Sequence, residues 1–238
     1  MIKVSILIPT FRRPESFLRA ARSVFAQTGV DGVELIAIDN SPEGSTLDTF
    51  RALQAVAPIP LRWAHEPKPG VAQARNAALK LAQGALVAWL DDDEEAAPHW
   101  LAALIAARRE TGAQSVFGPV RAQAPDDADN AAFYERLYAR SGPAVSGPTP
   151  RAWHRQLIAA ARHVRGHAVR CTRRSAWRGT TRCSPPGPKR ARPSPRAADA
   201  AVTEHLAERI RLAHGLTRLR LRTGSVRVGV GSAATMAR

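Results

Sequence analysis

The sequence predicts an α/β domain with a mostly parallel sheet flanked by helices over about residues 1–140. Two observations carry this prediction. Short aliphatic runs alternate along the chain with segments of helical periodicity, which is typical of parallel strands joined by crossover helices. The run at 85–90 is apolar at every position, as expected for a strand covered on both faces. The chain has 238 residues, which is enough for a domain with a substantial core.

The elements are predicted in chain order from local patterns. The aliphatic run 4–8 predicts a strand that ends at Pro9-Thr10. Pro14-Glu15 predicts the start of a helix, because proline fits the first helical turn and glutamate interacts favourably with the helix dipole. The same reasoning predicts further strands at 33–39, 61–65, 85–90 and 115–120, and further helices at 46–56, 70–82 and 98–107.

Polar residues follow three of the predicted strands, at Thr10, Asp39 and Asp91. In open parallel sheets, ligands bind beyond the carboxyl ends of the strands. Because these three positions lie at that edge of the predicted sheet, we expect a ligand site there.

The acidic run Asp91–Glu95 is the most informative cluster at this edge. Carboxylates on a tight turn repel one another unless a cation neutralises them, and hard oxygen ligands suit Mg²⁺ or Mn²⁺. Such a cation normally completes its ligand shell with substrate phosphates. The alternative is a solvated acidic turn that precedes a helix. The run by itself leaves both interpretations open.

Asp39 and Arg12-Arg13 each have a functional and an ordinary interpretation. The Asp39 carboxylate could accept hydrogen bonds from a base edge or a ribose hydroxyl, or it could cap its own loop as an Asx-turn. Arg12-Arg13 could meet a diphosphate, or could be solvated surface charge.

Gly70, Arg75 and Asn76 form the next candidate group. A glycine lets the backbone pass close to a ligand at a helix start, and the other two side chains follow within two turns. The alternative is a helix surface with a salt-bridged arginine.

Four motifs, in this order, resemble the family 2 glycosyltransferases, which are inverting sugar transferases of the GT-A type. The resemblance covers about residues 2–140 and implies a GT-A-like (Rossmann-like) fold. The motifs are Val4-Ser5-Ile6-Leu7-Ile8-Pro9-Thr10-Phe11-Arg12-Arg13, Glu34-Leu35-Ile36-Ala37-Ile38-Asp39-Asn40-Ser41, Gly70-Val71-Ala72-Gln73-Ala74-Arg75-Asn76 and Val87-Ala88-Trp89-Leu90-Asp91-Asp92-Asp93.

The resemblance implies a nucleotide-diphosphate sugar as donor, with a UDP-sugar expected first, and a divalent cation, Mg²⁺ or Mn²⁺. Asp91 and Asp93 correspond to the two acids of the family's Asp-x-Asp element, in which the last acid ligates the metal and the first faces the ribose or sugar. We assign nucleotide-sugar binding to Pro9, Thr10, Arg12, Asp39, Gly70, Arg75, Asn76, Asp91 and Asp92, and metal binding to Asp93 and Asp91.

The chain departs from the family pattern at two places. Its loop reads Asp39-Asn40-Ser41-Pro42 where Asp-Asp-Gly-Ser is commoner, which leaves the donor's identity open. Inversion also needs a general base for the acceptor hydroxyl, which the family supplies as a carboxylate in the acceptor half. The only acids after Glu135 are Asp199, Glu204 and Glu208, none in a matching context, so no catalytic residue is assigned and turnover is in doubt. The acceptor, whether saccharide, lipid or protein, is also open.

The charge is divided unevenly between the two parts of the chain. Residues 1–150 carry 15 Lys+Arg against 17 Asp+Glu, a net charge of −2. Residues 151–238 carry 20 against 3, a net charge of +17. We therefore separate residues 1–140, the glycosyltransferase-like domain, from 141–238, a basic Arg/Pro-rich segment in which 200–212 predicts an amphipathic helix. Binding of nucleic acid or another anionic surface by this segment is the alternative function.

Two other hypotheses explain the basic segment. It is an unusual acceptor domain, or the reading frame slips near residue 150. Dropping one base from the codons of Trp153-His154-Arg155-Gln156-Leu157 permits Gly-Thr-Gly-Asn, and a Gly-Asn pair is common near this place in the family that the chain resembles. We favour the displaced frame as a hypothesis.

The sequence also predicts a location. The N-terminus runs straight into a strand with no leader ahead of it, and no apolar run reaches the length of a membrane span. The expected location is the cytoplasm, with peripheral association at the inner face of the membrane left open.

Overall fold

The computed structural model describes residues 1–140, 158–160 and 200–206. The helices are α1 (Pro14–Phe25), α2 (Leu47–Gln54), α3 (Val71–Leu81), α4 (Trp100–Thr111) and α5 (Ala131–Tyr138). The strands are β1 (Val4–Thr10), β2 (Val33–Asp39), β3 (Leu61–His65), β4 (Leu86–Trp89), β5 (Glu94–Ala96), β6 (Ser115–Val116), β7 (Val120–Gln123), β8 (Ile158–Ala160) and β9 (Val202–His205).

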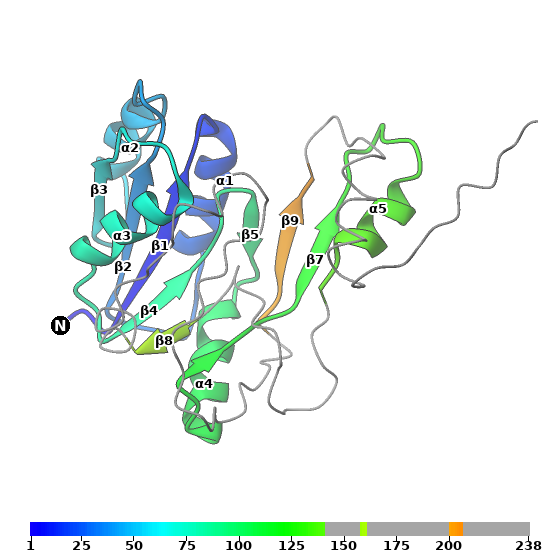
Figure 1. Ribbon diagram of the computed structural model, residues 1–238. Coiled ribbons are helices and arrows are strands. Elements are labelled where there is room, and N and C mark those ends of the chain that lie inside the picture. Colours follow the sequence, from blue (N-terminus) through cyan, green and yellow to red (C-terminus); the bar gives the residue numbers. More distant parts are fainter. Residues whose placement is uncertain (141–157, 161–199, 207–238) are drawn as a thin grey trace, which may run out of the picture.

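The larger sheet has the strand order β3-β2-β1-β4-β8-β6 (Figure 1). Strands β3, β2, β1 and β4 are parallel, and β8 runs antiparallel between β4 and β6. This arrangement confirms the predicted α/β class with a mostly parallel sheet. Because β1 and β2 are in register with Thr10 opposite Asp39, the polar residues at their ends meet at one edge.

Alternation along the strands divides the core into two layers. Ile6 and Ile8 of β1 belong to the larger layer, where Phe17 of α1 packs edge to face on Phe50 of α2 with ring centroids 4.7 Å apart. Leu7 belongs to the second layer, on the face that α3 covers. Strand β4 likewise has Ala88 in the larger layer and Val87 and Trp89 in the second, so it is apolar on both faces, as the sequence predicts for 85–90.

The predicted strand 115–120 divides between the two sheets. Ser115–Val116 pairs with β8 in the larger sheet, whereas Val120 begins β7 in the smaller sheet of order β5-β9-β7. Gly118 and Pro119 lie at the break, and proline has no N–H for a sheet ladder. The prediction of one strand here is therefore wrong.

Part of the basic segment belongs to the core, in strand β9 between β5 and β7 (Figure 1, orange). The predicted helix at 200–212 is wrong over its described part, because Val202–His205 pairs antiparallel with β5 and parallel with β7. Val202 is 1% exposed, and β-branched Val202 and Thr203 suit a strand. The rest of this predicted helix, at 207–212, lies outside the described residues. Residues 141–157 and 161–199 of the basic segment also lie outside them.

The burial of β9 predicts a difference between two truncations. We expect a chain that ends at residue 199 to be about 2–4 kcal/mol less stable than one that ends at residue 206, because it loses a buried valine and a strand ladder. Urea unfolding followed by circular dichroism measures the difference. Equal midpoints for the two chains would show that β9 contributes nothing to the fold.

Candidate functional site

An acidic turn follows β4 at the carboxyl edge of the larger sheet. The backbone N–H of Asp91 donates to Glu94 Oε2 at 3.1 Å, and the N–H of Glu94 returns a bond of the same length to the Asp91 carbonyl. From β9, the N–H of His205 donates to the Asp93 carbonyl at 2.8 Å. The turn is thus held by a buried glutamate on one side and by a strand from the far end of the chain on the other.

Asp92 is the inward-facing acid of the turn. Thr10 Oγ1 donates to its Oδ2 at 2.8 Å, so the end of β1 is tied to the turn across the sheet. Burial raises the pKa of Asp92 to about 6, and the charge of Asp93 adds to this effect, whereas the Thr10 hydrogen bond opposes it. Asp92 therefore links the turn to β1, and its carboxyl holds its proton more firmly than that of an exposed aspartate.

Asp91 and Asp93 are the more accessible acids, with side chains 20% and 22% exposed. Each faces an arginine from another element. Arg75 of α3 lies 3.6 Å from Asp91, and Arg13 lies 3.1 Å from Asp93. The guanidinium of Arg75 also stacks over the Trp89 ring at 5.1 Å from the centroid, which fixes its direction.

These residues fit a divalent cation that shares its ligands with a diphosphate. Asp91 and Asp93 offer hard carboxylate oxygens at the open edge, the donor type that Mg²⁺ and Mn²⁺ prefer. Within the described ranges, no group of three or more His, Cys, Asp or Glu could hold a metal by itself. A cation held by these two carboxylates would take further ligands from substrate and water, as is usual for Mg²⁺ beside phosphates.

Asp39 caps its own loop. Its Oδ1 accepts from the N–H and the hydroxyl of Ser41 at 2.8 and 2.7 Å, and its Oδ2 accepts from the N–H of Thr46 at 2.5 Å. The side chain is fully buried. Of the two interpretations that the sequence left open, the structure has the Asx-turn.

Arg12 and Arg13 point to different acids. Arg12 has a φ of 57°, and its guanidinium pairs with Glu43 at 2.6 Å, a hydrogen bond that lowers the pKa of Glu43. Arg13 instead faces the acidic turn, 3.6 Å from Asp92. The structure thus brings Arg13, and not the predicted Arg12, to the acidic turn.

The remaining predicted residues lie around the same edge. Pro9 precedes Thr10 in β1, Gly70 is the N-cap of α3, and Asn76 is partly buried on that helix next to Arg75. The structure therefore groups the predicted positions along the ends of β1, β2 and β4 and the start of α3.

Sequence reasoning missed the residues that support the turn. Glu94 was part of the acidic run, but nothing in the run distinguishes an inward-facing glutamate from a ligand. Glu204 and His205 gave no signal, because they lie in a segment without recognisable motifs. In the structure Glu204 is 3% exposed and pairs with Arg140 at 3.1 Å, and the His205 ring lies 3.1 Å from Glu95.

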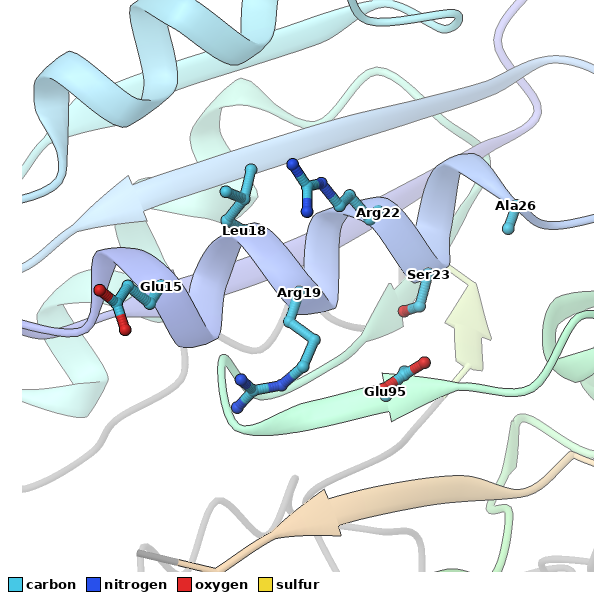
Figure 2. Close-up of a pocket in the computed structure, with 7 residues that line it drawn as sticks. All are labelled: Glu15, Leu18, Arg19, Arg22, Ser23, Ala26 and Glu95. Atoms are coloured by element: carbon cyan, nitrogen blue, oxygen red, sulfur yellow. The ribbon is translucent and has the colours of Figure 1, made fainter. Parts of the chain in front are cut away.

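A shallow hollow of about 470 Å³ lies apart from the predicted residues, between α1 and β5 (Figure 2). Arg19 and Ser23 extend from α1 toward the strand that carries Glu95. None of the residues assigned to nucleotide-sugar or metal binding lines this hollow, which is open and bordered by charges of both signs. The hollow is therefore separate from the candidate site at the carboxyl edge of the sheet.

No helix in the described part of the chain is both long enough and apolar enough to cross a membrane.

Comparison with known proteins adds a second line of evidence. The profile of the family described as "Glycosyl transferase family 2" matches residues 5–149. The succinoglycan biosynthesis protein ExoM of Rhizobium meliloti (strain 1021) is 35% identical over 123 residues, which are 51% of this chain and 40% of ExoM. The uncharacterized glycosyltransferase alr2836 of Nostoc sp. (strain PCC 7120 / SAG 25.82 / UTEX 2576) is 31% identical over 104 residues, 44% of this chain and 32% of that protein. The chain therefore spans less than half the length of either relative.

Two solved glycosyltransferase structures share the fold. Mannosyltransferase PcManGT from Pyrobaculum calidifontis, in complex with GDP-Man and Mn²⁺, aligns with a TM-score of 0.63 and 18% identity, covering 92% of this chain and 61% of that one. S. aureus TarS 1-349, in complex with UDP, aligns with a TM-score of 0.56 and 16% identity, covering 74% of this chain and 52% of that one. The shared architecture is the GT-A fold, which confirms the predicted fold class.

Proposed function

The chain belongs to glycosyl transferase family 2, and on that premise we propose that it binds a nucleotide-diphosphate sugar through a divalent cation and transfers the sugar, with inversion, to an acceptor. The observation that carries the proposal is the acidic turn at the carboxyl edge. Two accessible carboxylates, Asp91 and Asp93, each face an arginine there. A site that combines carboxylates with cations suits a diphosphate and its metal.

The residues have distinct proposed roles. Asp93 and Asp91 would hold the cation, which stabilises the negative charge that develops on the leaving nucleoside diphosphate. Arg13 and Arg75 neutralise the turn and lie where they can contact phosphate oxygens. Thr10, through Asp92, fixes the turn relative to β1. Pro9, Gly70 and Asn76 complete the proposed nucleotide-sugar pocket. Asp39 shapes its own loop and Arg12 pairs with Glu43, so neither is given a contact with the donor.

The relatives support a donor class and a cation. The solved neighbours are complexes with UDP and with GDP-Man and Mn²⁺. We propose a UDP-sugar as donor with Mg²⁺ or Mn²⁺. We propose a saccharide acceptor of the kind used in polysaccharide biosynthesis, because ExoM is a succinoglycan biosynthesis protein.

Calorimetric titration tests the proposal. UDP-sugars and GDP-sugars are titrated into the full chain with Mn²⁺ and again with a chelator. We expect affinity for one of these donor classes that requires the metal. Equal heats with metal and with chelator for every donor would contradict the proposal.

A second candidate function rests on the net charge of +17 in residues 151–238. That charge favours binding to nucleic acid with an affinity that falls steeply as salt increases. The chain that ends at residue 206 keeps β9 and removes the residues beyond it. Comparing it with the full chain on a salt series of DNA titrations shows whether those residues carry polyanion affinity.

We also propose narrower limits for the displaced reading frame. A strand with alternating burial, a fully buried Ala200 and a glutamate paired with Arg140 supports a native frame at 200–206. A single slip near residue 150 would displace every later residue, so a native frame at 200–206 requires a second, compensating slip before Ala200. Sequencing the gene from codon 140 to codon 210 decides this. An uninterrupted frame, shared with related chains, would exclude a displacement.

A further inference from the structure

The side chain of Asn40 joins two loops at the carboxyl edge of the sheet. Its Nδ2 donates to the carbonyl oxygens of Glu66 and Lys68, both at 2.8 Å. Its Oδ1 accepts from the N–H of Gly70 at 2.7 Å. We call these three hydrogen bonds the Asn40 bridge. They use both amide hydrogens and one lone pair of a residue that is only 4% exposed.

The loop that the bridge holds leads directly into α3. Pro67 and Pro69 have no backbone N–H, so residues 66–70 have few donors with which to order themselves. Gly70 has a φ of 147°, a conformation that suits glycine, and its carbonyl accepts the first helical bond, from Ala74. One side chain therefore sets where α3 begins relative to β2.

The position of α3 matters to the acidic turn. Arg75 lies five residues after Gly70 and reaches to 3.6 Å from Asp91. The Asn40 backbone is itself fixed, because its N–H donates to the Thr10 carbonyl at 2.9 Å. The bridge thus connects the end of β1, the loop after β2 and the helix that presents Arg75.

An aspartate of the same size cannot make this bridge. The two carbonyl oxygens need a donor, and a carboxylate would place a negative charge against both of them. The chemistry accounts for the Asp39-Asn40-Ser41-Pro42 loop, in which an amide stands where the commoner sequence has a second acid. Ser41 belongs to the same arrangement, since its hydroxyl donates to Asp39 and accepts from the N–H of Ser45.

We propose that Asn40 is a positioning residue of the donor site, which locks the 66–70 loop to β2 and thereby sets Arg75 against Asp91. The part of this proposal that concerns the donor rests on the proposed function. The part that concerns the order of the 66–70 loop rests on the Asn40 bridge alone. Asn40 in this role does not read the base of the nucleotide.

The test uses two variants of the full chain. Asn40→Asp keeps the size and the acceptor for the Gly70 N–H but loses both donations, and Asn40→Ser shortens the side chain without adding charge. For both we expect amide exchange at Gly70 to accelerate at least about tenfold, and the Kd for the bound nucleotide-sugar with Mn²⁺ to rise by about tenfold or more. Gln114→Glu, an exposed substitution with the same charge change, should alter neither value.

A pH series separates positioning from a general loss of stability. Relative to wild type at the same pH, the affinity loss of Asn40→Asp should shrink below pH 5, where a protonated carboxyl can donate to one carbonyl again. Asn40→Ser should show no such recovery. If Asn40→Asp fails to fold, Asn40→Ser carries the test.

Three results would overturn the proposal. They are unchanged exchange at Gly70 in both variants, unchanged donor affinity in both, or a switch of preference between UDP- and GDP-sugars without faster exchange, which would make Asn40 a base reader. If the wild-type chain binds no nucleotide-sugar, the proposed function fails and takes the donor role of Asn40 with it, and the exchange rates still decide whether the bridge orders the loop.

Discussion

Asp93→Ala is expected to remove the metal-dependent part of nucleotide-sugar affinity. Loss of residues that merely support metal ligands costs about 10–100-fold in affinity, so loss of a direct ligand should cost at least about 100-fold. Calorimetric titration of the donor with Mn²⁺ measures the effect.

The matched control for this variant is Asp127→Ala, which removes one exposed carboxylate that is not assigned to the site. It should bind the donor as the wild type does. With a chelator present, Asp93→Ala and wild type should become indistinguishable. Full metal-dependent affinity in Asp93→Ala would place the cation elsewhere.

Asp92→Asn is expected to stabilise the metal-free protein at neutral pH and not at low pH. Burial raises the pKa of Asp92 from 3.8 to about 6, so the folded protein keeps a proton that the unfolded chain loses between these values. The wild type therefore loses stability as pH rises through this window. An amide resembles the neutral acid and can still accept from Thr10 Oγ1. Above pH 7 the free energy of unfolding of the variant should exceed that of wild type by up to about 3 kcal/mol, and near pH 4 the two should be equal.

Urea unfolding of both proteins from pH 4 to pH 8 measures this difference. Asp127→Asn is the control, and its difference from wild type should stay flat over the same range. Added Mn²⁺ should reduce the gain of Asp92→Asn at pH 7, because a neighbouring cation favours the ionised carboxyl. If the stability difference between Asp92→Asn and wild type did not change with pH, Asp92 would be ionised over the whole range from pH 4 to pH 8.

Much of the first half follows from local patterns. Strands β1 and β4 are apolar on both faces, and the acidic turn comes directly after β4, so the edge they share is predictable without coordinates. Roles within that edge are less predictable. The adjacent residues Arg12 and Arg13 are chemically identical, and only the backbone turn at Arg12 sends one to Glu43 and the other to Asp93.

The second half shows a different limit. Residues 200–206 lie in a segment whose composition suggests a solvated basic tail, yet Val202 is buried in a strand between β5 and β7. Its partners in β5 lie more than a hundred residues earlier. Pairing at that distance depends on how the rest of the chain folds, and four residues are too few for a periodic pattern to reveal it.

The sequence by itself determined the α/β class, the edge at which we propose the site and the acidic run at that edge, because strand and helix periodicity and strand ends are local properties. Only the tertiary structure decided that Asp39 caps its loop, that Asn40 bridges to the start of α3, and that β9 supports the acidic turn. Each of these depends on the direction of a side chain or the pairing of distant segments, and both are set by packing after the elements have formed.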